Sequence, residues 1–308
     1  MMMKKTRFLS LFAFAAAAPL GAAVIASDSF LTGGSDYNTA LVLPGQGPAV
    51  TGFTGDWGAT GDPVASSVSM RPISTGLTLG AYGTGGAVES YRDGSSTSVG
   101  HIRMERSFSG PPQVVAGTDL YFSALIQYTT DYYSGVGLNF SARGFFGVGF
   151  TAEGKAGIWT QPSVIGQNPA IAPTFVAQTT STYSPNTTYL VVGKLDAEAS
   201  GGSTNPETIT LVGVYAVGDS LVEGTLLTSD QDVYFSEDDV SGNFGGQTLN
   251  ATGLVSLKSM GGTVAIFDEI TYGTTFLDVA PVPEPSTYAL LVGLVTLGGA
   301  LIRRRIRC

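Results

Sequence analysis

The sequence predicts an all-β body, an antiparallel β-sandwich or jelly roll, flanked by an N-terminal signal helix and a C-terminal transmembrane helix. Three observations lead to this prediction. Forty-two glycines and a charged fraction of only 13% favour many short strands joined by tight turns. The body contains stretches that alternate with period two and no sustained apolar repeat at helical spacing. Uncharged runs with basic residues beside them lie at both ends of the chain.

The alternation is clearest between residues 120 and 128, where every second residue is apolar or aromatic. One face of this predicted strand carries Leu120, Phe122, Ala124, Ile126 and Tyr128. Similar strand candidates span residues 99–108, 135–142, 145–151, 189–195, 208–217 and 263–272. Two packed antiparallel sheets would bury one face of each strand, so we expect the body, residues 24–280, to be a sandwich.

Residues 1–23 are predicted to be a secretory signal peptide. Basic residues precede an uncharged run at 8–18, and small residues follow at 21–23. We expect signal peptidase to cleave after Ala23, with Ala26 as the alternative, once the secretion translocon has engaged the chain. A retained membrane anchor is the other interpretation, but the run is short for a stable span.

Residues 281–308 combine a proline-rich segment, a transmembrane span at 287–302 and a basic tail at 303–308. As a helix, residues 288–302 would reach roughly 22 Å against a hydrocarbon core of about 30 Å, so the span is short unless basic side chains reach the interface. A buried C-terminal helix is the alternative. The membrane stop is formed by Arg303, Arg304, Arg305 and Arg307.

This ending resembles the PEP-CTERM sorting signal of Gram-negative bacteria. The motif Val-Pro-Glu-Pro-Ser occupies residues 282–286, ahead of the apolar span and the arginine cluster. The resemblance implies that an exosortase recognises Pro283, Glu284 and Pro285 as its substrate and cuts nearby. It also implies a protein that is held in the inner membrane before processing and then reaches the cell surface or extracellular matrix. Cys308 does not fit a prenylation box.

The body shows a second resemblance, to concanavalin-A-like and laminin-G-like sandwiches. It rests on short segments at residues 27–30, 45–47 and 51–57, and on Phe-Asp-Glu-Ile at 267–270. The resemblance implies that the first and last strands of the body pair, which would close the domain next to its anchor. No disulfide can contribute, because Cys308 is the only cysteine.

The body is strongly acidic. Seven of the 15 basic residues but only one of the 24 acidic residues lie in the two end segments, which leaves the body with a net charge of −15. This excess disfavours a nucleic-acid partner. Calcium remains an alternative to an expectation of no cofactor. Its candidate ligands are Glu237, Asp238 and Asp239, with Asp28 or Asp36 as helpers, against the simpler interpretation of a solvated acidic loop.

The residues do not predict an enzyme. Ser220 lies in a Gly-Asp-Ser-Leu string, but the only histidine, His101, is far upstream instead of late in the chain. Asp268 and Glu269 are adjacent in a predicted strand, so we expect them to point to opposite faces. A glycosidase needs two carboxylates across one cleft.

Four aromatic residues lie in glycine-rich or turn-like surroundings, where a ring either stacks on a sugar or caps the core. They are Trp57, Trp159, Tyr132 and Tyr133. We expect a noncatalytic, exported surface or extracellular-matrix protein that associates with exopolysaccharide. The alternatives are an exported carbohydrate-active enzyme and a calcium-dependent carbohydrate-binding module.

Overall fold

A computed structural model describes most of residues 24–280 and none outside that span. The described residues are 24–32, 36–41, 43–61, 68–80, 82–83, 85–92, 100–110, 119–129, 133–140, 144–161, 174–196, 208–229, 249–258 and 262–280. The predicted signal helix and transmembrane helix therefore lie outside the described residues. Within these residues, no helix is long and apolar enough to cross a membrane.

The described residues form fifteen strands and one short helix. In chain order they are β1 (Val24–Asp28), β2 (Phe53–Gly61), β3 (Val68–Ile73), β4 (Ala87–Arg92), β5 (Gly100–Phe108), β6 (Asp119–Tyr128), β7 (Ser134–Phe140), β8 (Gly144–Phe150), β9 (Lys155–Gln161), β10 (Thr174–Thr182), β11 (Thr188–Asp196), β12 (Thr208–Tyr215), β13 (Leu227–Ser229), β14 (Leu249–Lys258), β15 (Gly262–Gly273) and α1 (Phe276–Val279).

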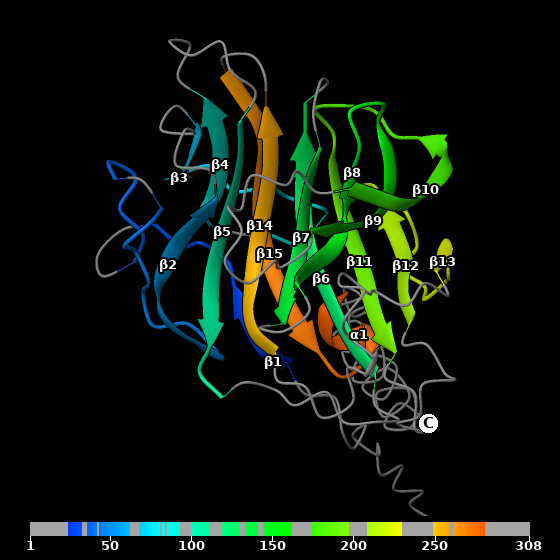
Figure 1. Cartoon of the computed structure of the whole chain (residues 1–308), viewed down its shortest axis with the longest axis horizontal. Helices are drawn as coiled ribbons and strands as arrows, with labels where there is room; N and C mark the ends of the chain where they lie inside the picture. The colour runs from blue at the N-terminus through cyan, green and yellow to red at the C-terminus, as the bar shows by residue number, and fades with distance from the viewer. Residues whose placement is uncertain are drawn as a thin grey trace, which may run out of the picture.

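The strands form two sheets, which confirms the predicted sandwich architecture (Figure 1). The larger sheet has the order β13-β12-β11-β6-β15-β4-β3, and β1 also pairs with β15. The smaller sheet has the order β10-β9-β8-β7-β14-β5-β2. Neighbouring strands are antiparallel in both sheets, including those far apart in sequence, such as β14 and β5.

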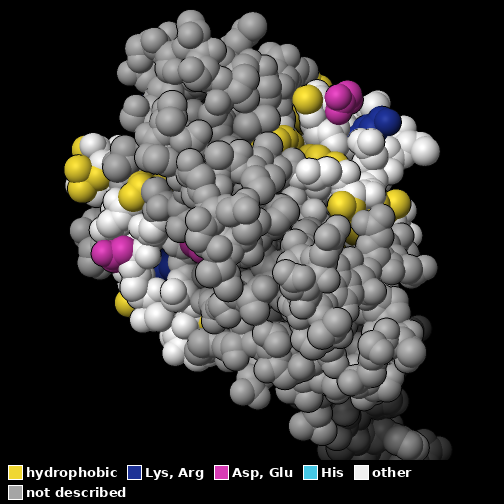
Figure 2. Space-filling view, viewed as in Figure 1, with side chains coloured by type: hydrophobic (Ala, Val, Ile, Leu, Met, Phe, Trp, Pro, Cys, Tyr) yellow, Lys and Arg dark blue, Asp and Glu magenta, His cyan; other side chains and the backbone are white. Residues whose placement is uncertain are grey.

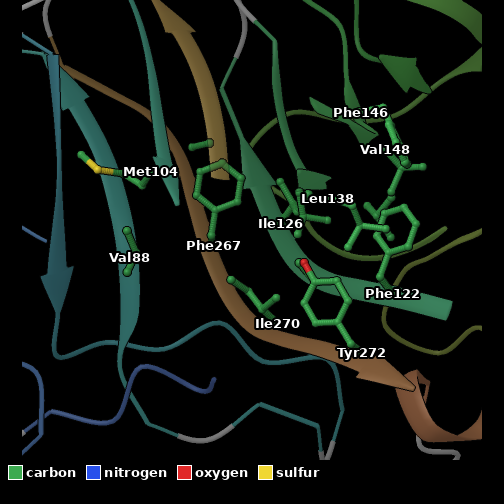
Figure 3. Close-up of a cluster of buried hydrophobic side chains, with 14 of the residues drawn as sticks. Val88, Met104, Phe122, Ile126, Leu138, Phe146, Val148, Phe267, Ile270 and Tyr272 are labelled. Carbon is green, nitrogen blue, oxygen red and sulfur yellow. The ribbon is translucent and has the colours of Figure 1, made fainter. Parts of the chain in front are cut away.

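The main core lies between the sheets. Figure 3 shows side chains from β4, β6 and β15 of the larger sheet facing side chains from β5, β7 and β8 of the smaller one. The labelled members are Val88, Met104, Phe122, Ile126, Leu138, Phe146, Val148, Phe267, Ile270 and Tyr272, all of which are buried. Full burial of a large apolar side chain contributes about 1.5–3 kcal/mol, so this core supplies stability that no disulfide provides.

The outer face of the larger sheet is covered as well. In β6, Phe122 and Ile126 point into the main core, as the alternation predicted, whereas Tyr121 and Leu125 belong to a second apolar cluster on the other face. Leu77 and Leu79 of the segment before β4 and Phe276 of α1 complete this second cluster. Strands of the larger sheet are therefore apolar on both faces.

The first and last strands of the body pair, as the second resemblance implied. Val24 lies opposite Gly273, and Asp28 lies opposite Ile270. The edge of β15 is shared, because β4 pairs with its first half and β1 with its second. The body is therefore closed by joining the two ends of its chain.

Asp268 and Glu269 depart from the predicted alternation. Phe267 and Ile270 both pack in the main core, so two residues instead of one lie between consecutive inward positions of β15. The pairing of β15 with β6 shifts register here, and Glu269 has a φ of 48°. This bulge places both carboxylates on the outer side of the sheet. Burial raises the pKa of Tyr82 on that side, and the charges of Glu269 and Asp268 add to the rise. The prediction of opposite faces was wrong.

Candidate functional site

The targeting residues lie outside the described residues. This holds for Ala23, for Pro283, Glu284 and Pro285, and for the four arginines of the basic tail. It also holds for Cys308, Tyr132 and the calcium candidates Glu237, Asp238 and Asp239. Within the described residues, no group of three or more His, Cys, Asp or Glu side chains is arranged to hold a metal ion.

Asp28, predicted as a helper for calcium, is instead committed to a buried ion pair. Its carboxylate lies 2.8 Å from Arg106, and both side chains are about 1% exposed or less. Asp28 also accepts hydrogen bonds from the Tyr37 hydroxyl at 2.6 Å and the Phe30 amide at 3.0 Å. Burial raises the pKa of Asp28, and these three partners oppose that rise. This network joins the larger sheet, through β1, to the smaller sheet, through β5.

Two further polar residues were considered for catalysis, Ser220 and His101. Ser220 is exposed in the turn after β12, where the Asp219 carboxylate accepts a hydrogen bond from the Ala216 amide at 2.7 Å. This agrees with the interpretation of a polar turn. His101 lies in β5, as the sequence predicted, but its side chain is outside the described set.

The outer face of the smaller sheet is lined with glycine along β7 and β8. Four glycines pair across these strands: Gly135 with Gly149 and Gly137 with Gly147. Val136 and Val148 point into the main core, so the glycines lie on the opposite, outer face. A Cβ atom on Gly147 would lie 2.0 Å from the Val136 carbonyl oxygen and 2.8 Å from Trp159 Cζ2. Side chains larger than hydrogen do not fit there.

An aromatic cluster occupies the space that the glycines leave. It consists of Tyr133, Phe145, Trp159 and Phe175. Trp159 lies against Gly135, whose Cβ atom would come within 2.3 Å of the indole nitrogen, and its ring centroid is 5.0 Å from that of Phe145. The Arg103 guanidinium lies over the Phe145 ring at 5.1 Å and forms an ion pair with Glu105. Aromatic rings and a charged pair therefore meet on one face of the smaller sheet.

Two polar atoms of this aromatic cluster are buried without a hydrogen-bond partner among the residues that the structure describes. They are Trp159 Nε1 and the Tyr133 hydroxyl oxygen. Trp159 is 1% exposed and Tyr133 is 9% exposed. Burial raises the pKa of the Tyr133 hydroxyl well above its usual range, so this group keeps its proton and remains a donor. An unmatched buried donor costs about 1–3 kcal/mol, which makes both groups candidates for a ligand contact.

The two tryptophans differ in this respect. Trp57 is also buried, but its Nε1 donates to the Tyr37 hydroxyl at 2.8 Å, within the network of Asp28 and Arg106. Trp57 therefore belongs to the core, in agreement with the second of the two interpretations of its ring. The signal that distinguishes Trp159 in sequence is the pair of Gly-x-Gly strings at 135–137 and 147–149.

The part of the surface that the structure describes carries charges of both signs. In the view of Figure 2, basic and acidic side chains are scattered over the described surface, and no basic patch is visible there.

Comparison with solved structures identifies the fold class. The marine PL-14 alginate lyase from Aplysia kurodai is similar over 82% of this chain and 100% of its own, with a TM-score of 0.50 and 10% identity. Domain 4 of a GH43 extracellular arabinanase from Geobacillus stearothermophilus, solved with arabinotriose, has a TM-score of 0.39 and 14% identity over 84% and 98% of the two chains. The first likeness establishes the fold of this chain alone.

Comparison with family models identifies the sorting signal. Residues 281–305 match the PEP-CTERM protein-sorting motif, which confirms the first resemblance. This motif implies an exported protein that is sorted by an exosortase and anchored at the surface of a Gram-negative bacterium. A search of curated protein sequences gives no match to this chain.

Proposed function

We propose that this chain is a noncatalytic surface or extracellular-matrix protein that associates with exopolysaccharide. One observation carries the proposal: the sorting motif begins at residue 281, directly after the buried Ala280 that ends the described body. In this proposal, signal peptidase cleaves after Ala23 and the arginines at 303–307 hold the precursor in the inner membrane. An exosortase then acts at Pro283, Glu284 and Pro285, and the body is displayed outside the cell.

Replacing Pro283, Glu284 and Pro285 together by alanine should block processing. Because these residues form the proposed recognition motif, the variant should keep its full tail and stay in the inner membrane, while the native protein should end near the motif. Intact mass and cell fractionation measure both properties. If native and variant proteins both keep Cys308 and remain in the inner membrane, the ending is an ordinary anchor and the sorting proposal fails.

The aromatic cluster supports the choice of exopolysaccharide as partner. Polysaccharides are rich in hydroxyl oxygens that accept hydrogen bonds. Tyr133, Phe145 and Trp159 are buried beside the glycines of β7 and β8, so the support comes from two donors, Trp159 Nε1 and the Tyr133 hydroxyl, which have no acceptor among the described residues. A hydroxyl-rich chain that reaches this face would supply the missing acceptors.

Replacing Trp159 by phenylalanine should weaken binding of exopolysaccharide purified from the producing bacterium several-fold. The change removes an N–H donor that has no partner within the described part of the chain, so no hydrogen bond described there is lost. Affinity electrophoresis in gels that contain the polysaccharide measures binding, and urea unfolding measures stability.

Trp57→Phe is the matched control, because it makes the same change at a buried indole whose donor is paired. It should lose about 1 kcal/mol more stability than Trp159→Phe and keep the binding. Equal binding by wild type and Trp159→Phe would show that the aromatic cluster is structural. Cleavage of the polysaccharide by the wild-type protein would instead favour the carbohydrate-active enzyme.

A further inference from the structure

Both ends of the described body lie at one end of the sandwich. Val24 begins β1 opposite Gly273, which ends β15, and α1 follows two residues later (Figure 1). The predicted signal peptide precedes Val24 directly, and the matched sorting motif begins at residue 281. We name this end the terminal pole and define it by Val24, Gly273 and α1. Two segments with membrane affinity thus join the body at the same place.

The C-terminal connection at the terminal pole is rigid. The Asp278 carboxylate accepts hydrogen bonds from the amides of Thr274 at 3.0 Å and Thr275 at 2.8 Å. The Ser123 hydroxyl of β6 donates to the Val279 carbonyl oxygen at 2.6 Å, and Ala280 is fully buried. No flexible linker therefore separates the sheet from residue 281.

The length of chain between the body and the predicted span limits their separation. Residues 281–286 reach at most about 20 Å when fully extended. An anchored precursor consequently holds the terminal pole within about 20 Å of the bilayer surface.

Large apolar side chains are exposed at and beside this pole. Leu277 of α1 is 60% exposed, Val222 is 66% exposed and Val24 is 46% exposed. The loop that carries Val222 lies beside α1, because the Tyr215 hydroxyl donates to the Val222 carbonyl oxygen at 2.6 Å and the Tyr215 ring lies 6.2 Å from that of Phe276. Apolar side chains that point to solvent near a bilayer gain free energy by entering its interface.

We propose that the terminal pole is a docking surface for the surface of a zwitterionic bilayer, with Leu277 and Val222 entering the interface while the precursor is anchored. The inference rests on the membrane span of the proposed function. We choose zwitterionic lipid because Glu223 lies in the same loop as Val222 and would be repelled by anionic headgroups. The Glu223 carboxylate accepts a hydrogen bond from the Tyr121 hydroxyl at 2.6 Å. Docking orients the body and keeps its far end away from the membrane.

The test uses the full chain with Cys308→Ser, carrying one new cysteine at a time. Leu277→Cys reports on the terminal pole. Glu153→Cys reports on the other end, since Glu153 precedes Gly154, which is packed near the Tyr128 hydroxyl at the far end of β6 from Tyr121. Each protein carries a fluorescent dye and is reconstituted in phosphatidylcholine and phosphatidylethanolamine vesicles that contain nitroxide-labelled lipids.

We expect several-fold stronger quenching at position 277 than at position 153. Adding Val222→Glu to the Leu277→Cys protein should reduce that quenching while the chain still floats with the vesicles. Equal quenching at the two positions in a floating chain would overturn the docking surface and leave the anchor intact. If the chain does not float with the vesicles, the membrane span of the proposed function is contradicted, and so is the docking surface that depends on it.

Discussion

Replacing Arg106 by methionine should lower the free energy of unfolding by about 3–5 kcal/mol, because it leaves Asp28 as a buried carboxylate without its cation. Arg106 is 1% exposed and also donates to the Tyr37 hydroxyl at 2.8 Å and to the Pro48 carbonyl oxygen at 2.5 Å. The change therefore removes the cross-link between the two sheets. Urea unfolding at neutral pH measures the loss.

Arg71→Met is the matched control for this prediction. Arg71 also pairs with a carboxylate on a neighbouring strand, Glu89, at 2.9 Å, but its side chain is 47% exposed. Exposed ion pairs contribute at most about 1 kcal/mol, so this variant should lose little stability. Similar losses for the two variants would show that the buried pair contributes no more than a surface pair.

We expect the free energy of unfolding to fall as the pH rises, because Asp268 must lose its proton in a buried site. Burial raises the pKa of Asp268 to about 8, and the neighbouring charge of Glu269 adds to this rise. An unfolded aspartate has a pKa of about 3.9, so the folded state binds more protons between the two values. The contribution of protonated Asp268 to the free energy of unfolding is therefore greatest near pH 4, and it is lost as the pH rises through 8. The loss is on the order of 5 kcal/mol at most.

Two variants test this pH dependence by urea unfolding between pH 5.5 and 9. Asp268→Asn should flatten the decline, although it sacrifices an acceptor for the Leu77 or Glu269 amide, which Asp268 binds at 2.9 and 2.8 Å. Glu269→Gln should lower the pKa of Asp268 and move the decline to lower pH. If Asp268→Asn declines as steeply as the wild type, another group causes the pH dependence.

Alternation in the sequence predicted seven of the fifteen described strands, namely β5, β6, β7, β8, β11, β12 and β15. Alternation within β6 is a local property, and packing of Phe122 and Ile126 in the main core follows it. The second resemblance, which rests on short motifs, predicted that the first and last strands pair. The pairing of β1 with β15 confirms this prediction. The predicted strand at 208–217 ended two residues too late, because Ala216 and Val217 continue the apolar pattern beyond the paired backbone.

Other features depended on contacts that alternation does not encode. The bulge at Asp268 and Glu269 becomes visible only when Phe267 and Ile270 are both found in the core. Trp57 and Trp159 both lie close to glycine in sequence. Among the described residues only the Trp57 indole has an acceptor, which is Tyr37 from a distant loop. Long-range pairing of this kind decides which aromatic residue is a candidate for binding.

The position of β15 has a mechanical consequence. This strand leads through α1 to the C-terminal attachment, and it is flanked by β6 on one side and by β4 and β1 on the other. Tension applied between the cell and a bound matrix would pull β15 along its own axis. Antiparallel hydrogen bonds run perpendicular to that axis, so both ladders would share the load in shear instead of opening one bond at a time. The strand nearest the attachment is thus the one best supported against force.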